Sequence, residues 1–134
     1  MKKLLLILTI ILAVSAFSQN QQTETTVKKV EASYPGGISV FRDDFMKMVY
    51  AYVDITAYAV NGKFTFIINI DENGKMTGLK SFPRVKNDDE FVEDMNFALK
   101  RLKKKWKPAS LNDVPVATNI SLQINFSSDH SDHE

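Results

Sequence analysis

The sequence predicts an α+β fold in two layers, with the element order helix-strand-strand-helix-strand. Three observations lead to this prediction: two segments with apolar residues at helical spacing, a pair of alternating segments joined by a glycine turn, and a third alternating segment near the end of the chain. Such strands form a three-stranded antiparallel sheet, and both helices can bury their apolar sides on one of its faces. A chain of 134 residues is one domain at most.

The beginning of the chain has the pattern of a secretory signal peptide over residues 1–18. Two lysines precede an apolar run over residues 4–14, and Ala16 and Ser18 are the small residues expected before cleavage at Gln19. A retained membrane anchor is the alternative. However, the 14 uncharged residues that end with Phe17 span only about 21 Å as a helix, against about 30 Å of bilayer hydrocarbon. We therefore expect cleavage and export.

The composition excludes several function classes. Cleavage removes two of the 17 basic residues, which leaves 15 against 16 acidic ones and a net charge of −1. A nearly neutral chain is a poor general binder of nucleic acid. The absence of cysteine excludes a disulfide framework and a thiolate nucleophile.

The first predicted helix follows a polar leader. Residues 19–33 have almost nothing to bury, and we expect them to be flexible. The segment Tyr34-Pro35-Gly36-Gly37 then interrupts regular structure, because proline fixes its own φ and glycine permits a sharp bend. From Ile38 onward the apolar residues are three and four apart, which predicts a helix over residues 39–52, with a break at Asn61-Gly62.

A β-hairpin is predicted next. Residues 64–70 alternate between large apolar and smaller or polar side chains, and Asp71-Glu72-Asn73-Gly74 supplies a turn with a glycine suited to positive φ. The second strand covers residues 75–82. Its apolar residues Met76 and Leu79 are three apart, so both reach the core face only if a bulge forms at Thr77-Gly78.

The second predicted helix begins after a cap at Asn87 and ends before Lys107-Pro108. Its apolar stripe consists of Phe91, Met95, Ala98, Leu102 and Trp106. Six of the eight residues 100–107 are basic. They form either a patch for phosphate or lipid headgroups or the solvated side of the helix near its negative end, and the stripe favours the solvated side.

The last predicted strand covers residues 114–126, after a turn at Asn112-Asp113. Its even-numbered residues face the core and its odd-numbered polar residues face water. Residues 127–134 form an acidic, histidine-containing tail that we expect to be disordered.

No arrangement of residues for catalysis is found. We expect that the chain is not an enzyme and that it binds no cofactor or small-molecule substrate. The two histidines lie in the tail, so a serine nucleophile would lack a fixed base. The tail carboxylates and histidines could hold a divalent metal weakly, but a solvated end is the favoured interpretation. We therefore predict no metal site.

The last strand is the candidate binding element. It lies either at the centre of the sheet or at an edge, and an edge would invite an extended peptide or a second copy of the chain. Four or five backbone hydrogen bonds at about 1 kcal/mol each fall short of the roughly 8 kcal/mol of micromolar binding, so side-chain contacts must contribute. The predicted partner-binding residues are Val116, Thr118, Ile120, Leu122 and Ile124.

These segments, taken in order, resemble the C-terminal domain of TonB-type energy transducers. The likeness covers residues 34–126. It begins at Tyr34-Pro35-Gly36-Gly37, passes through the predicted hairpin, and ends with Trp106-Lys107-Pro108-Ala109, Val114-Pro115-Val116 and Ile124-Asn125-Phe126. The resemblance implies the same two-layer fold, a periplasmic location, and a last strand that pairs with a segment of an outer-membrane transporter. The residues that carry the resemblance, with implied structural roles, are Tyr34, Pro35, Gly36, Gly37, Gly62, Gly74, Trp106, Pro108, Pro115 and Phe126.

The chain also departs from that family. A full transducer would keep an uncleaved membrane helix and a long proline-rich spacer, whereas this leader contains no proline. Three hypotheses follow: a stand-alone periplasmic domain that binds an outer-membrane receptor, a self-associating envelope protein that dimerises through its last strands, or a short anchored transducer if residues 1–18 are retained. The stand-alone domain is the favoured one.

Overall fold

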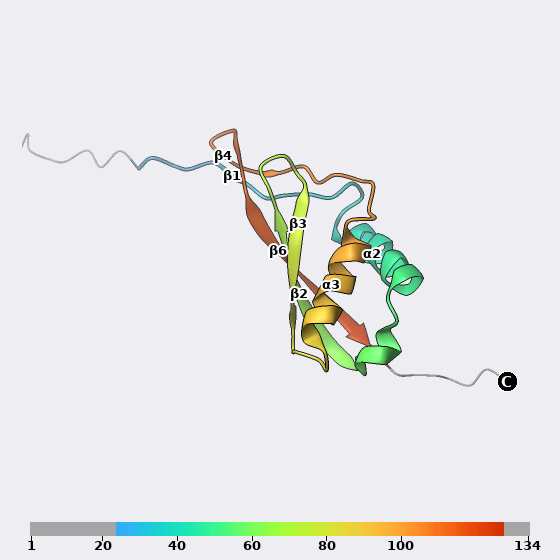
Figure 1. Ribbon diagram of the computed structural model, residues 1–134. Helices are drawn as coiled ribbons and strands as arrows, with labels where there is room; N and C mark the ends of the chain where they lie inside the picture. Colours follow the sequence, from blue (N-terminus) through green and yellow to red (C-terminus); the bar gives the residue numbers. More distant parts are fainter. Residues whose placement is uncertain (1–23, 128–134) are drawn as a thin grey trace, which may run out of the picture.

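The computed structural model describes residues 24–127. They form a small α+β domain with two helices and two three-stranded antiparallel sheets, which confirms the predicted fold class (Figure 1). The elements in chain order are β1 (Lys29–Val30), α2 (Ile38–Tyr52), the short 3-10 helix η2 (Ile55–Tyr58), β2 (Gly62–Ile70), β3 (Met76–Phe82), α3 (Asp88–Leu99), β4 (Ala109–Leu111), β5 (Val114–Val116) and β6 (Thr118–Phe126).

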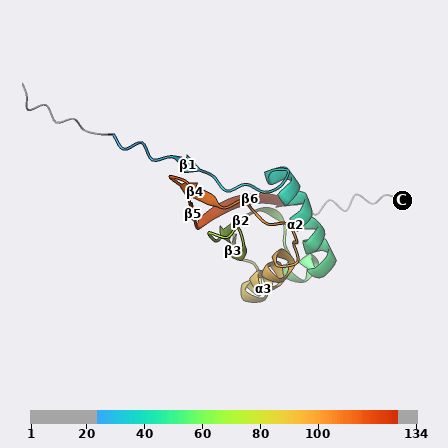
Figure 2. The same cartoon turned by 90° about the horizontal axis from the view of Figure 1, so that it is seen from above.

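The main sheet has the strand order β3-β2-β6, and both helices lie on the same side of it (Figure 2). The alternation predicted for β2 is confirmed, because Phe64, Phe66, Ile68 and Ile70 are all buried. They pack against buried side chains of α2 and α3, which are Phe41, Phe45, Val49, Phe91, Met95, Ala98 and Leu99. The opposite face of the sheet includes Lys63, Thr65 and Asn69 of β2 and the odd-numbered residues of β6.

The β2–β3 hairpin closes through the predicted turn. The carboxylate of Asp71 accepts hydrogen bonds from the amides of Asn73 and Lys75, at 2.9 and 2.8 Å. Gly74 adopts a φ of 79°, the left-handed region that favours glycine. The predicted bulge is also confirmed, because Asn69 pairs with Gly78 while the next residue, Ile70, pairs with Met76.

The second helix is shorter than predicted. It ends at Leu99 rather than near Trp106, and the last amides bond three residues back, as from Arg101 to Ala98. Trp106 is nevertheless buried, because the chain turns and brings its amide to the carbonyl oxygen of Gly74 at 3.2 Å. A contact with the distant hairpin thus replaces the last turns of the helix. Asn87 also does not cap α3 with its side chain, and the carboxylate of Asp88 instead accepts from the amide of Val85 at 3.0 Å.

The prediction of one strand over residues 114–126 is wrong in part, because β5 and β6 are separated at Ala117. β5 forms a hairpin with β4 through Asn112-Asp113, both at positive φ. The predicted flexible leader is likewise corrected for Lys29–Val30, which pairs with β4 as β1. These three short strands form a second sheet next to the start of β6.

The predicted signal peptide (1–18) and nearly all of the predicted tail (127–134) lie outside the described residues.

Candidate functional site

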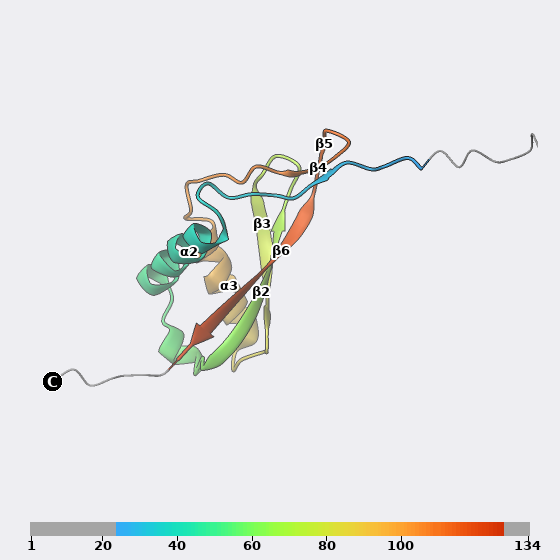
Figure 3. The ribbon, with the colours of Figure 1, turned by 180° about the vertical axis from the view of Figure 1, so that it is seen from behind.

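β6 is an edge strand of the main sheet. It pairs with β2 over its full length, from Phe126 opposite Gly62 to Thr118 opposite Ile70. Among residues 24–127 no strand pairs with its other side (Figure 3). Of the two positions left open by the sequence, the edge position is therefore the one adopted.

The register of the sheet determines which backbone groups of β6 face outward. The amide of Leu79 in β3 donates to the side-chain oxygen of Asn96 at 3.1 Å, so it faces away from β2. Opposed residues of antiparallel strands alternate between hydrogen-bonded and non-bonded pairs. Ile68, the partner of Leu79, therefore directs its backbone groups to Ile120 of β6.

The outward groups of β6 follow by the same alternation. The backbones of the even-numbered residues face β2, and those of the odd-numbered residues face the open side. The N–H and C=O groups available to another strand belong to Asn119, Ser121, Gln123 and Asn125. We call these four residues the docking row.

The predicted partner-binding residues occupy the alternate positions. The side chains of Leu122 and Ile124 are buried, and those of Thr118 and Ile120 are half-buried. Val116 lies in β5 opposite Ala109 rather than in β6. The four of these residues that lie in β6 therefore build the main sheet and its core, and the positions able to pair with another strand differ from them by one residue. The sequence gives the alternation, but only the register of three strands shows which way each amide points.

The side chains of the docking row are uncharged. All four are exposed, and β6 contains no charged residue from Thr118 to Phe126. Their cross-strand neighbours in β2 are Lys63, Thr65, Ile67 and Asn69. This part of the exposed face can pair its amides and hydroxyls with polar side chains of an added strand.

Backbone pairing at the docking row gives modest affinity by itself. Four outward residues can exchange about eight hydrogen bonds with an added strand, or roughly 8 kcal/mol before ordering costs. Fixing the added residues costs about 1–2 kcal/mol each, which cancels much of this gain. Binding at this edge therefore needs further contacts from the uncharged side chains beside it.

The Tyr34-Pro35-Gly36-Gly37 segment leads into α2 and also packs against it. The amide of Gly37 donates to the carbonyl of Tyr34 at 2.8 Å, and both glycines have positive φ. The Tyr34 ring packs on Phe41 and Trp106, with centroids 5.0 and 5.3 Å away. The predicted structural roles of Tyr34 and Trp106 thus correspond to one aromatic cluster.

The remaining residues of the resemblance also lie at structural positions. Gly62 opens β2 at a φ of 86°, and Phe126 packs its buried ring against Phe64 and Phe66. Pro108 is half-buried beside the bridge between Ser33 and Lys107. Pro115 lies opposite Ser110, next to the Leu111–Val114 pair that closes the two-residue turn. Opposed pairs alternate between hydrogen-bonded and non-bonded, so the Ser110–Pro115 pair is non-bonded and the missing N–H of proline costs no bond to β4.

An ion pair joins this cluster to the segment after α3. The carboxylate of Asp44 accepts from the Tyr34 hydroxyl at 2.8 Å and from the Lys104 ammonium at 3.0 Å. These hydrogen bonds, that of Tyr34 first, lower the pKa of Asp44. Burial and the adjacent carboxylate raise the pKa of Tyr34 above its ordinary value. The hydroxyl therefore stays protonated and acts as a donor.

The part of the chain described by the structure contains no cluster of three or more histidine, cysteine or acidic side chains that could hold a metal ion. The tail residues considered for weak metal binding, His130 and His133, lie outside it. Within residues 24–127, no helix is long and apolar enough to cross a membrane.

Comparison with known proteins gives no relative. No family model, no curated protein and no solved structure matches the chain. Its function must therefore be inferred from the residues themselves.

Proposed function

We propose that this chain is an exported, periplasmic protein-binding domain that resembles the C-terminal domain of TonB-type transducers. In this proposal β6 docks an extended segment of an outer-membrane receptor, which adds a fourth strand to the main sheet. The observation that supports it most is the open edge of β6, with four residues whose backbone groups face outward. The absence of a charged side chain from β6 also supports it, since lysines are a common means of protecting an edge.

The decisive variant removes one outward donor without touching the β2–β6 ladder. In Ser121→Pro the lost amide faces the open side, where proline is tolerated in an edge strand. Ser121→Ala keeps the amide and serves as the matched control. We expect the native protein and Ser121→Ala to retain an outer-membrane receptor from solubilised membranes, identified by mass spectrometry, and Ser121→Pro to lose at least tenfold of it.

A second proline variant separates docking from folding. Leu122→Pro removes an amide that faces β2, and we expect it to destabilise the domain by about 3 kcal/mol or more. Ser121→Pro should keep the native circular dichroism spectrum. Equal receptor capture by Ser121→Pro and the native protein would contradict docking at β6.

Dimerisation through β6 is the alternative function. It is favoured by the same lack of charge, because two copies related by a two-fold axis would meet without like-charge repulsion. Sedimentation should then show a dimer that Ser121→Pro dissociates.

The third hypothesis, an anchored short transducer, depends on residues 1–18. The mass of the exported protein decides it, because a chain that starts at Gln19 has no anchor.

A further inference from the structure

A cavity of about 690 Å³ lies at the β3 edge of the main sheet, the edge opposite β6. Ten residues line it, and five of them are lysines: Lys75, Lys100, Lys103, Lys104 and Lys105. The others are Leu99, Leu102, Met76, Thr77 and Gly74. This is a high local concentration of positive charge for a chain with a formal net charge of +1.

The early end of α3 builds this cavity. One wall is the β2–β3 turn and the start of β3, and the other is the irregular segment 102–105. The second wall is attached at its two ends, where Leu102 bonds to Leu99 and Trp106 bonds to Gly74.

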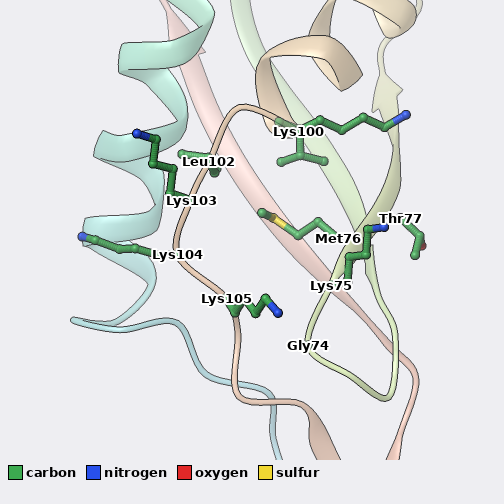
Figure 4. A pocket seen from close by; sticks show the side chains of 10 residues that line it. Gly74, Lys75, Met76, Thr77, Lys100, Leu102, Lys103, Lys104 and Lys105 are labelled. Atoms are coloured by element: carbon green, nitrogen blue, oxygen red, sulfur yellow. The ribbon is translucent and has the colours of Figure 1, made fainter.

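The lysines differ in where they point. Lys75, Lys100 and Lys105 lie around the cavity with Met76 between them, and Leu102 lies beside Lys103 on the side of α2 (Figure 4). Lys103 and Lys104 point toward α2, where Lys104 pairs with Asp44. Within residues 24–127, the three lysines at the opening have no ion-pair partner. The end of α3 contributes about half a negative charge, which three ammonium groups outweigh.

The floor of the cavity is apolar. Leu99 is fully buried, and Met76 and Leu102 are partly buried against the core. A ligand that fills this space therefore contacts aliphatic side chains below and ammonium groups at the rim.

We infer that this cavity is a binding site for an amphiphilic anion, a single aliphatic chain with a carboxylate or phosphate head. An ionised carboxylate or phosphate only accepts hydrogen bonds, and the lysines at the rim only donate them. A peptide fits less well, because its N–H groups need acceptors and Thr77 is the one lining side chain with a good acceptor oxygen. The cavity volume is in the range of small-molecule sites.

Dodecanoate below its micellar concentration is the direct probe, added to the purified protein. Isothermal titration calorimetry measures its binding. We expect dodecanoate to bind at least tenfold more tightly than butyrate, because the longer chain covers the apolar floor. The double variant Lys75→Gln/Lys105→Gln should weaken dodecanoate binding at least tenfold. The matched control Lys63→Gln/Lys86→Gln removes two charges elsewhere and should change binding less than twofold.

Several results would overturn this inference. Equal binding of neutral dodecyl maltoside would show that the lysines have no part, and equal binding of inorganic phosphate would show that the apolar floor has none. Binding to vesicles of anionic phospholipid without binding of dodecanoate would indicate a flat membrane contact rather than a chain in the cavity. If Ser121→Pro lost receptor capture but still bound dodecanoate, the result would support docking at β6 and leave the cavity proposal in place, because β2 separates the two sites.

Discussion

The two edges of the main sheet are built differently. At β3, the side chain of Asn96 in α3 accepts from the outward amide of Leu79, and a bulge at Thr77 bends the strand. At β6, no side chain among the described residues bonds to the outward amides, and the strand is regular over nine residues. At β3 one outward amide is thus bonded within the protein, whereas within residues 24–127 none is at β6.

This difference bears on function because an uncovered regular edge is an aggregation hazard that proteins ordinarily remove. The same chain covers β3 with a helix side chain and a bulge, so the means of protection are present in this fold. The unprotected edge of β6 is therefore the feature on which the proposed docking rests. The segment after α3 is held by two further contacts, the bond from Trp106 to Gly74 in the β2–β3 turn and the ion pair of Lys104 with Asp44 in α2.

The largest expected effect comes from breaking the contact at Gly74. A Cβ at this position would collide with the carbonyl oxygen of Trp106, and the backbone is at positive φ. We expect Gly74→Ala to lower the free energy of unfolding by roughly 3 kcal/mol, measured by urea denaturation.

Gly62→Ala is the matched control for that variant. Gly62 also has a positive φ, but no atom lies within 4 Å of the added Cβ. It should cost only the backbone strain of about 1–2 kcal/mol. A loss as large as that of Gly74→Ala would show that the contact with Trp106 adds nothing.

Local patterns predicted much of this architecture. The α2 stripe, the β2–β3 turn and the bulge depend on residues close together in sequence, and each is confirmed. The end of α3 was missed because Leu102 and Trp106 continue the helical spacing, and only the distant Gly74 explains the actual path. The small sheet was missed because its strands have two or three residues each and depend on long-range pairs such as Lys29 with Leu111.

The docking site on the last strand stays a prediction, and the structure shows only that this strand lies at an edge of the main sheet. The sequence located it on the last strand from the length and alternation of that segment. The identity of the outward residues depends on a bond from Leu79 to Asn96 two strands away, which no local pattern contains. The lysine cavity was likewise visible only as a basic run, whose geometry depends on where α3 ends.

A smaller effect is expected from uncovering the β3 edge. Asn96→Ala leaves the amide of Leu79 without its acceptor, and we expect a loss of about 1–3 kcal/mol in the free energy of unfolding. Asn96→Asp keeps an acceptor oxygen but loses the bond from the side-chain nitrogen to the carbonyl of Val92, so it should cost less. If the two variants were equally destabilised, the Leu79 bond would not be what protects this edge.

The smallest effect concerns the ion pair that fastens the segment after α3. The pKa of Asp44 lies below its ordinary 3.8, first because of the Tyr34 hydroxyl and then because of Lys104. A carboxylate with a lowered pKa stabilises the folded protein above about pH 4, and this contribution is lost as the pH falls through its folded pKa. Stability measured by urea denaturation from pH 6 to pH 2 should therefore fall less steeply in Asp44→Asn than in the native protein. Tyr34→Phe removes the main cause of the shift while keeping the carboxylate, and should give an intermediate slope. Identical slopes for all three proteins would mean that the bonds of Asp44 do not contribute to the stability of the fold.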